Sequence, residues 1–266
     1  MILRAFTGAV IVGLIVASIW YGHLTFQCLW LLLMGIGFSE ARGMNPAPYM
    51  GMTFPICSLI WIGSCAVYIY SGSLTILLSG LLFSLFLFFA FGISDFREDC
   101  KEEYFREFSS SFLLFGYVGV FYTPMLYIAE AFTPAKSWLF FLFLIMWLQD
   151  TFAYLGGRLF GRRPLSTQLS PKKTWEGALV GLITACIIVG LLHSWFPDPD
   201  PASLVFLALI IGLAGQAGDL MESFLKRSFQ VKDSGMIFPG HGGVLDRFDS
   251  VVAGSIVFLT LVIPET

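Results

Sequence analysis

Residues 74–93 read LTILLSGLLFSLFLFFAFGI, a run of 20 residues without a charged side chain. About 20 apolar residues form a helix long enough to cross the hydrocarbon core of a bilayer. The rest of the chain has the same character, since 57% of its 266 residues are hydrophobic and only 12% are charged. Soluble domains average about 25% charged residues, so this chain has too little polar surface to cover a water-soluble globule. The sequence therefore predicts an integral membrane protein.

Similar apolar runs recur along the chain and are separated by turn-forming residues. About nine of them have the length expected of a spanning helix. They cover residues 5–21, 24–38, 49–70, 74–93, 111–132, 138–157, 177–196, 202–224 and 248–262. We expect an all-α integral membrane fold of about nine transmembrane helices. It would form a single membrane domain, with N-terminal helices in residues 1–135 and a catalytic region in residues 136–266.

Basic residues divide unequally between the loops that nine spans would place on opposite sides. Fourteen Lys and Arg fall on the side of the N-terminus, and Lys136 alone falls on the other. Cytoplasmic loops of membrane proteins carry such an excess of Lys and Arg. We therefore expect a multi-pass protein of the cell (inner) membrane with its N-terminus in the cytoplasm. The net charge of −3 gives no reason to expect nucleic-acid binding.

Asp150 is the first polar residue of interest in the C-terminal half. It lies about seven residues from the cytoplasmic end of its predicted helix, which is roughly 10 Å at the helical rise per residue. A carboxylate at that depth is costly in lipid and usually faces a polar cavity. The alternative interpretation is a structural Asp that pairs with a neighbouring Arg or hydroxyl.

The segment Ser170-Pro171-Lys172-Lys173 contains a second signal. Ser followed by Pro is typical of a helix N-cap and first turn. Two lysines in a first turn would oppose the helix dipole. A bound polyanion such as a triphosphate would explain them, because helix N-termini bind anions. Alternatively, the lysines only follow the excess of positive charge in cytoplasmic loops.

The third signal is a polar helix face. Asp219, Glu222, Ser223, Lys226 and Arg227 follow the i, i+3, i+4, i+7, i+8 spacing and share one side of a helix. Two acids beneath two bases suit a hard cation that bridges to phosphate. A set of internally paired salt bridges is the alternative.

A Gly-rich turn and two further acids follow. Glycines 240, 242 and 243 would let backbone N–H groups approach a phosphate closely. Asp246 and Asp249 would supply a second pair of oxygen ligands at the start of the last helix, although Asp246 could be only an N-cap. Mg²⁺ binds through a few carboxylates plus substrate phosphates. The residues together predict phosphoryl or nucleotidyl transfer at the cytoplasmic face of a membrane.

The segment from Ser223 to Asp249 resembles the long motif of the phosphatidate cytidylyltransferase family. Here it reads SFLKR, four residues, KDSG, two residues, and FPGHGGVLDRFD. The resemblance extends to residues 150–157 and 170–177 and covers roughly residues 147–250. It implies that CTP and phosphatidic acid give CDP-diacylglycerol and pyrophosphate, for phospholipid biosynthesis, in a Mg²⁺-dependent reaction. It also implies a polar funnel open to the cytoplasm and a homodimer.

The resemblance also implies roles for individual residues. Asp219 and Asp246 are the first choices as metal ligands, Glu222 and Asp249 are further candidates, and a second metal ion is left open. The candidate catalytic residues are Asp219, Asp246, Lys226, Arg227, Lys232, Asp233, His241 and Asp150. The candidate substrate-binding residues are Lys172, Lys173, Ser170, Ser223, Gly240, Gly242, Gly243 and Arg247. His241 could donate to a phosphate or only fix the loop.

Two other functions compete with this one. A CTP-dependent lipid or polyprenol kinase would use similar substrates but would release CDP. A transporter would place charges near the membrane midplane and show repeats, whereas here the charges gather toward one face.

Overall fold

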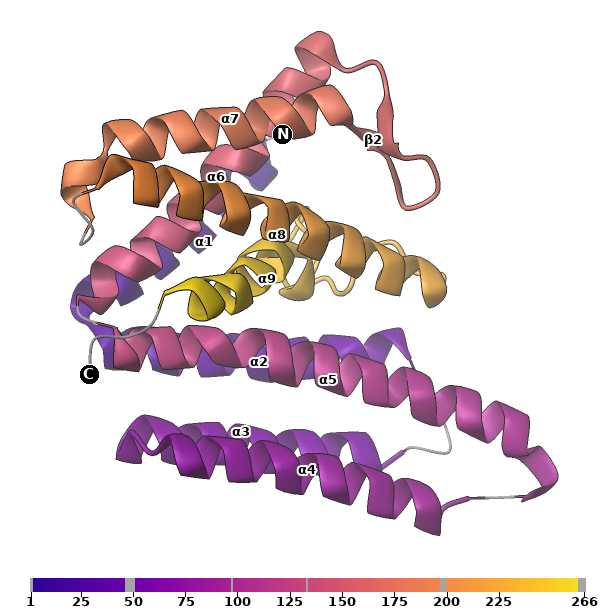
Figure 1. Cartoon of the computed structure of the whole chain (residues 1–266). Helices are drawn as coiled ribbons and strands as arrows, with labels where there is room; N and C mark the ends of the chain where they lie inside the picture. The colour runs from indigo at the N-terminus through magenta and orange to yellow at the C-terminus, as the bar shows by residue number, and fades with distance from the viewer. Residues whose placement is uncertain (1, 46–50, 97, 133, 197–199, 263–266) are drawn as a thin grey trace.

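The structure is a computed structural model that describes residues 2–45, 51–96, 98–132, 134–196 and 200–262 (Figure 1). These residues form nine α-helices, two short 3₁₀ helices and a two-stranded hairpin. The helices of the first half are α1 (Ile2–Tyr21), α2 (His23–Met44), α3 (Thr53–Ser71), α4 (Leu74–Ser94) and α5 (Lys101–Ala131). Those of the second half are α6 (Ala135–Phe160), α7 (Trp175–Leu191), α8 (Pro201–Ser228) and α9 (Leu245–Leu261). The 3₁₀ helices cover Glu98–Cys100 and His193–Trp195.

Each of the nine predicted apolar runs overlaps one of these helices. The run of residues 177–196 also includes the second 3₁₀ helix, and Tyr49 and Met50 of the third run lie outside the described residues. Six helices are long and apolar enough to cross a membrane, namely α2, α3, α4, α6, α8 and α5 together with its preceding 3₁₀ turn. Two more apolar helices, over Phe6–Tyr21 and Trp175–Leu191, are shorter. A helical protein with several helices able to span a membrane is therefore confirmed, and the count of nine spans stays a prediction.

The hairpin corrects the sequence prediction. Strand β1 (Pro164–Ser166) pairs antiparallel with β2 (Ser170–Thr174), so Ser170 and Pro171 do not begin a helix. The N-cap of α7 is Thr174, whose Oγ1 accepts from Gly177 N at 3.2 Å. Trp175 N donates to Arg163 O at 3.0 Å and joins the start of α7 to the hairpin. Lys172 and Lys173 therefore lie on a strand that leads into α7, and not in the first turn of that helix.

Small residues allow the helices around the site to approach closely. A Cβ at Gly181 of α7 would lie 2.5 Å from the carbonyl oxygen of Gln149 on α6. A Cβ at Gly218 of α8 would lie 2.7 Å from the carbonyl oxygen of Asp249 on α9. Close approach at small residues is the usual basis of helix packing in membranes. It places α6 beside α7 and α8 beside α9 (Figure 1).

An aromatic cluster connects the two halves of the chain. Trp30 of α2 is fully buried, and its Nε1 donates to the carbonyl of Tyr122 on α5 at 2.8 Å. Its ring lies 5.3 Å from the ring of Phe248 on α9, the residue before Asp249. Both halves contribute side chains to one hydrophobic core. The helices of residues 1–135 therefore support the helix that carries Asp246 and Asp249.

Candidate functional site

A cavity of about 580 Å³ with many charged side chains in its lining lies between α6, the hairpin, the start of α7, α8 and α9. Its polar and charged lining comprises Gln149, Asp150, Tyr154, Arg158, Ser170, Lys172, Lys173, Thr174, Gln216, Asp219, Lys226, Asp246, Arg247, Asp249 and Ser250. Three segments that the sequence singled out separately, residues 150–158, 170–174 and 219–249, thus meet in one place.

Lys226 is the centre of the charge pairing in this cavity. Its Nζ lies 2.5 Å from Asp246 Oδ1 and also forms an ion pair with Glu222, one helical turn earlier on α8. The Lys226 side chain is 13% exposed, and Glu222 as a residue is 1% exposed. The alternative of internal salt bridges therefore holds for the Glu222–Lys226 part of the predicted polar face. Glu222 forms an ion pair with Lys226 and does not itself line the cavity.

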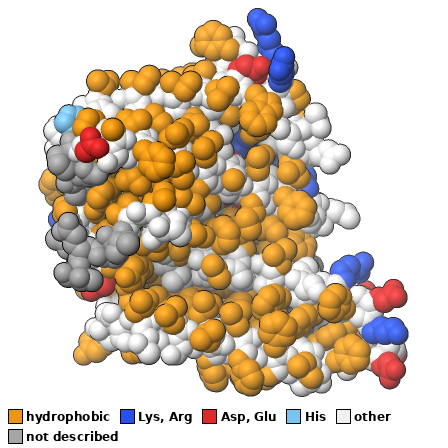
Figure 2. Space-filling view, viewed as in Figure 1, with side chains coloured by type: hydrophobic (Ala, Val, Ile, Leu, Met, Phe, Trp, Pro, Cys, Tyr) orange, Lys and Arg blue, Asp and Glu red, His pale blue; other side chains and the backbone are white. Residues whose placement is uncertain are grey.

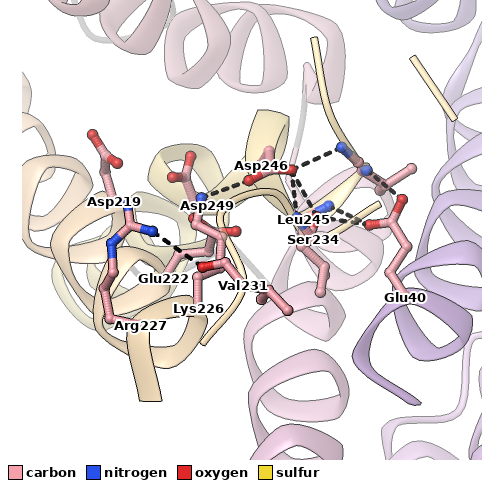
Figure 3. Close-up of polar contacts among 12 residues, drawn as sticks. Glu40, Asp219, Glu222, Lys226, Arg227, Val231, Ser234, Leu245, Asp246 and Asp249 are labelled. Atoms are coloured by element: carbon pink, nitrogen blue, oxygen red, sulfur yellow. Dashed lines mark hydrogen bonds and ion pairs between the residues drawn. The ribbon is translucent and has the colours of Figure 1, made fainter. Parts of the chain in front are cut away.

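Asp246 is held by the backbone as well as by Lys226. Its Oδ2 accepts from Ser234 N at 2.8 Å, from Ser234 Oγ at 2.9 Å and from Gly243 N at 2.8 Å (Figure 3). Gly242 has φ of +86°, a conformation that favours glycine and lets the loop turn here. The carboxylate is therefore fixed, with Oδ2 bound by the loop and Oδ1 bound by Lys226.

Glu40 of α2 is a buried acid beside this loop that the sequence analysis missed. It accepts from Val244 N at 2.8 Å, from Leu245 N at 3.0 Å and from Ser234 Oγ at 3.1 Å (Figure 3). The predicted second span ended at Phe38, which placed Glu40 in a loop. The available signal was an acid two residues after the end of that run, because the partners of Glu40 lie about two hundred residues later in the chain.

On the other side of the cavity, Lys173 of β2 forms an ion pair with Asp219 of α8. Burial in the cavity lowers the pKa of the Lys173 ammonium, while the carboxylates of Asp249 and Asp150 act in the opposite direction. Lys172, its neighbour on β2, is exposed and also lines the cavity. The hairpin therefore supplies two ammonium groups to the site, as a triphosphate-binding role would require.

Asp249 and Asp150 complete the acidic lining. Asp249 is 7% exposed, and its Oδ1 accepts from Ser250 N at 2.7 Å. Asp150 comes from α6, on the wall of the cavity next to the hairpin. Both carboxylates share the cavity with Asp219, as predicted.

Several predicted site residues do not line the cavity, although all are described. Arg227 donates to Val231 O at 3.1 Å, while Lys232 and Asp233 are exposed in the following loop. Ser223 is buried on α8. His241 lies against α1, where a Cβ at Gly8 would be 3.5 Å from its Nε2. The remaining residues of this set are Glu222, Gly240, Gly242 and Gly243.

The glycines of the loop approach carboxylates, where the sequence suggested a phosphate. A Cβ at Gly242 would lie 2.5 Å from Asp246 Oδ2, and one at Gly243 would lie 2.5 Å from Glu40 Oε1. The glycines are needed because the loop wraps closely around these two acids.

The predicted metal ligands are paired with protein groups. Within the described ranges, no three His, Cys, Asp or Glu side chains gather as a ready-made cation site. Lys173 forms an ion pair with Asp219, and Lys226 forms ion pairs with Glu222 and Asp246. The donor set nevertheless suits a hard cation, since the carboxylates of Asp219, Asp246 and Asp249 line one cavity.

Comparison with known proteins identifies the family of this chain. A sequence profile described as the cytidylyltransferase family matches residues 2–263. The chain belongs to the cytidylyltransferase family. The resemblance inferred from the motif is therefore confirmed.

Individual members of the family are named for one activity. A phosphatidate cytidylyltransferase of Staphylococcus saprophyticus is 46% identical over 137 residues, which are 51% of this chain and 51% of that protein. One of Rickettsia conorii is 39% identical over 158 residues, 56% of this chain and 68% of that protein. The chain thus spans about half the length of the staphylococcal relative and about two thirds of the rickettsial one.

Proposed function

We propose that this protein transfers the cytidylyl group of CTP to phosphatidic acid, forming CDP-diacylglycerol and pyrophosphate for phospholipid biosynthesis. The observation that carries the proposal is the cavity itself. It brings the lysines of the hairpin and the acids of α8 and α9 together in a helical membrane protein of the cytidylyltransferase family. A site with both charges suits a reaction between two phosphates.

The proposed reaction does not require a strong general base. In the proposed reaction a phosphate oxygen of phosphatidic acid attacks the α-phosphorus of CTP, and pyrophosphate leaves. The attacking oxygen is already anionic, so catalysis is positioning and charge neutralisation. Lys172 and Lys173, which lie on the hairpin, would bind the triphosphate. Arg247, which lies on α9, would bind a phosphate group. Lys226 would face the reacting groups from the wall of the cavity.

Mg²⁺ is part of the proposal. Asp219, Asp246 and Asp249 would hold it in exchange for the lysines that pair with Asp219 and Asp246, because all three line the cavity and supply the oxygen ligands that Mg²⁺ prefers. When bound, the ion would neutralise charge on the phosphate oxygens. Glu222 is a weaker candidate in this geometry, since its carboxylate is paired with Lys226 outside the cavity lining.

The proposed topology has nine spans, a cytoplasmic N-terminus and a funnel-like cavity that opens to the cytoplasm of the inner membrane. The 14-to-1 division of basic residues in the sequence supports this orientation. In Figure 2 most of the Lys and Arg on the visible face lie toward its right-hand edge. That edge is where the hairpin and the start of α5 lie (Figure 1). A homodimer is proposed from the resemblance alone.

The test is an assay of the detergent-solubilised full chain with CTP and phosphatidic acid, with and without Mg²⁺. Pyrophosphate release coupled to a cytidine-containing lipid is expected. Release of CDP with a phosphorylated lipid would identify a kinase, and no reaction would overturn the proposal. Asp219→Asn should abolish turnover, whereas the exposed Asp99→Asn is the matched control and should retain it. Mg²⁺ should also raise the thermal stability of the wild type but not of Asp219→Asn.

A further inference from the structure

The N-terminus of α9 is capped from a distant part of the chain. The first N–H groups of a helix have no partner within the helix. The local N-cap residue, Val244, makes no side-chain cap hydrogen bond. Glu40 of α2 accepts from Val244 N at 2.8 Å and from Leu245 N at 3.0 Å instead. A carboxylate at a helix N-terminus is also favoured by the helix dipole.

Glu40 is connected to Asp246 through one hydroxyl group. Ser234 Oγ lies 3.1 Å from Glu40 Oε2 and 2.9 Å from Asp246 Oδ2. Ser234 N and Gly243 N donate to the same Asp246 oxygen. A shift of the loop would therefore move Asp246, whose other oxygen contacts Lys226 in the cavity.

The glycine pattern of the loop is a second, independent observation. A Cβ at Gly235 would lie 2.5 Å from Glu40 Oε1, and a Cβ at Gly243 would lie at the same distance from that oxygen. Real Cβ atoms do not approach an oxygen so closely. Both positions therefore have to be glycine while the Glu40 carboxylate lies between them. The backbone of the loop therefore packs directly against the Glu40 carboxylate at Gly235 and Gly243.

We propose that Glu40 is a positioning residue for the reaction. From α2 it fixes residues 234–245 and the first turn of α9, so that Asp246 and Asp249 face the cavity. Glu40 does not line the cavity among the described residues, so it acts through Asp246 and the helix. The effect on turnover rests on the proposed function, whereas the effect on the loop does not.

The test compares Glu40→Gln with the wild type. Gln keeps the size of the side chain but turns an NH₂ group toward backbone N–H donors. We expect kcat to fall about 10- to 100-fold, as for other groups that orient a metal-binding carboxylate. The KM for CTP should change less than about threefold, because in the proposed function the hairpin lysines would contact the triphosphate independently of Glu40. Hydrogen exchange at Val244 and Leu245 should accelerate at least about tenfold.

The matched control is Glu103→Gln. Glu103 has a 55% exposed side chain and forms an ion pair with Arg106 at 3.9 Å on α5. This variant should leave both turnover and exchange unchanged. Unchanged kcat per folded protein in Glu40→Gln, or unchanged exchange at Val244 and Leu245, would overturn the proposal. An equal loss in Glu103→Gln would overturn it as well.

Ser234→Ala keeps the proposal testable if Glu40→Gln does not fold. It leaves both bonds from Glu40 to α9 and removes the shared hydroxyl. Loss of one net hydrogen bond corresponds to a roughly 2- to 10-fold lower kcat; wild-type kcat in this variant would overturn the positioning role. Wild-type protein without cytidylyltransferase activity would instead contradict the proposed function, and the exchange measurement would still decide the role of Glu40.

Discussion

Replacement of Lys226 by Met should destabilise the protein strongly, because it leaves a buried acid without its partner. Glu222 is 1% exposed, and its ion pair is with Lys226. Asp246 would keep the two N–H donors and the hydroxyl of the loop, so most of the cost falls on Glu222. Removing one partner of a buried ion pair typically costs about 3–5 kcal/mol.

The neighbouring Lys226–Asp246 contact gives the scale of one ion pair at this site. Two unit charges 2.5 Å apart, the separation of Lys226 Nζ and Asp246 Oδ1, attract by about 7 kcal/mol at an effective dielectric constant near 20. Part of this attraction offsets the desolvation of both groups in the native protein. A net loss of about 3–5 kcal/mol therefore lies within the range that the geometry allows.

The free energy of unfolding can be measured by titrating the detergent-solubilised protein with SDS and following helix content. The double variant Glu222→Met/Lys226→Met should regain most of the lost stability, because two apolar side chains can replace a buried pair at little cost. Turnover should stay absent in both variants, since Lys226 lines the cavity. Lys101→Met, at an exposed position on α5, should change stability by less than about 0.5 kcal/mol.

Two results would refute this reasoning. One is a single variant as stable as the wild type, which would mean that Glu222 does not depend on Lys226. The other is a double variant no more stable than the single one, which would mean that packing of the lysine stem dominates over its charge.

Three further substitutions test other parts of the site. Gly243→Ala places a methyl group against the Glu40 carboxylate and should lower kcat more than about tenfold, whereas Gly43→Ala, with open space at its Cβ position, should not. Lys173→Met removes the partner of Asp219 and should raise the KM for CTP more than Lys172→Met does, in steady-state assays of both variants. Gly181→Ala forces α7 away from α6 and should cost about 1–3 kcal/mol in SDS unfolding, with helix content unchanged before the transition.

The positions of the helices were predictable because a spanning helix needs an apolar run of nearly fixed length. The hairpin was not predictable, since Ser170-Pro171 suits both a helix start and an edge strand, in which Pro is tolerated. The choice depends on Thr174, which caps α7, and on the pairing of Arg163 with Trp175. These contacts lie outside the Ser-Pro pair itself.

Site residues that share one helix face could be predicted from their spacing. Residues whose position depends on the loop after α8 were harder to predict. The spacing of Asp219 and Lys226 on α8 places both at the cavity. Arg227 has the same periodicity but bonds to Val231 O, because the chain turns back just after α8. Glu40 was missed because its partners are fixed only by the packing of α2 against the second half of the chain.

The pairing of lysines with carboxylates leaves the cavity almost electrically neutral. Five basic side chains (Arg158, Lys172, Lys173, Lys226 and Arg247) and four acidic ones (Asp150, Asp219, Asp246 and Asp249) line it, which gives a formal charge of +1. Such a balance generates little long-range field, so electrostatic steering adds little to the capture rate of an anion. Recognition then depends on the exchange of partners at short range, where mobile salt screens charges least. In the proposed reaction, a nucleotide would meet charges that are already matched, and it would bind by replacing one partner with another.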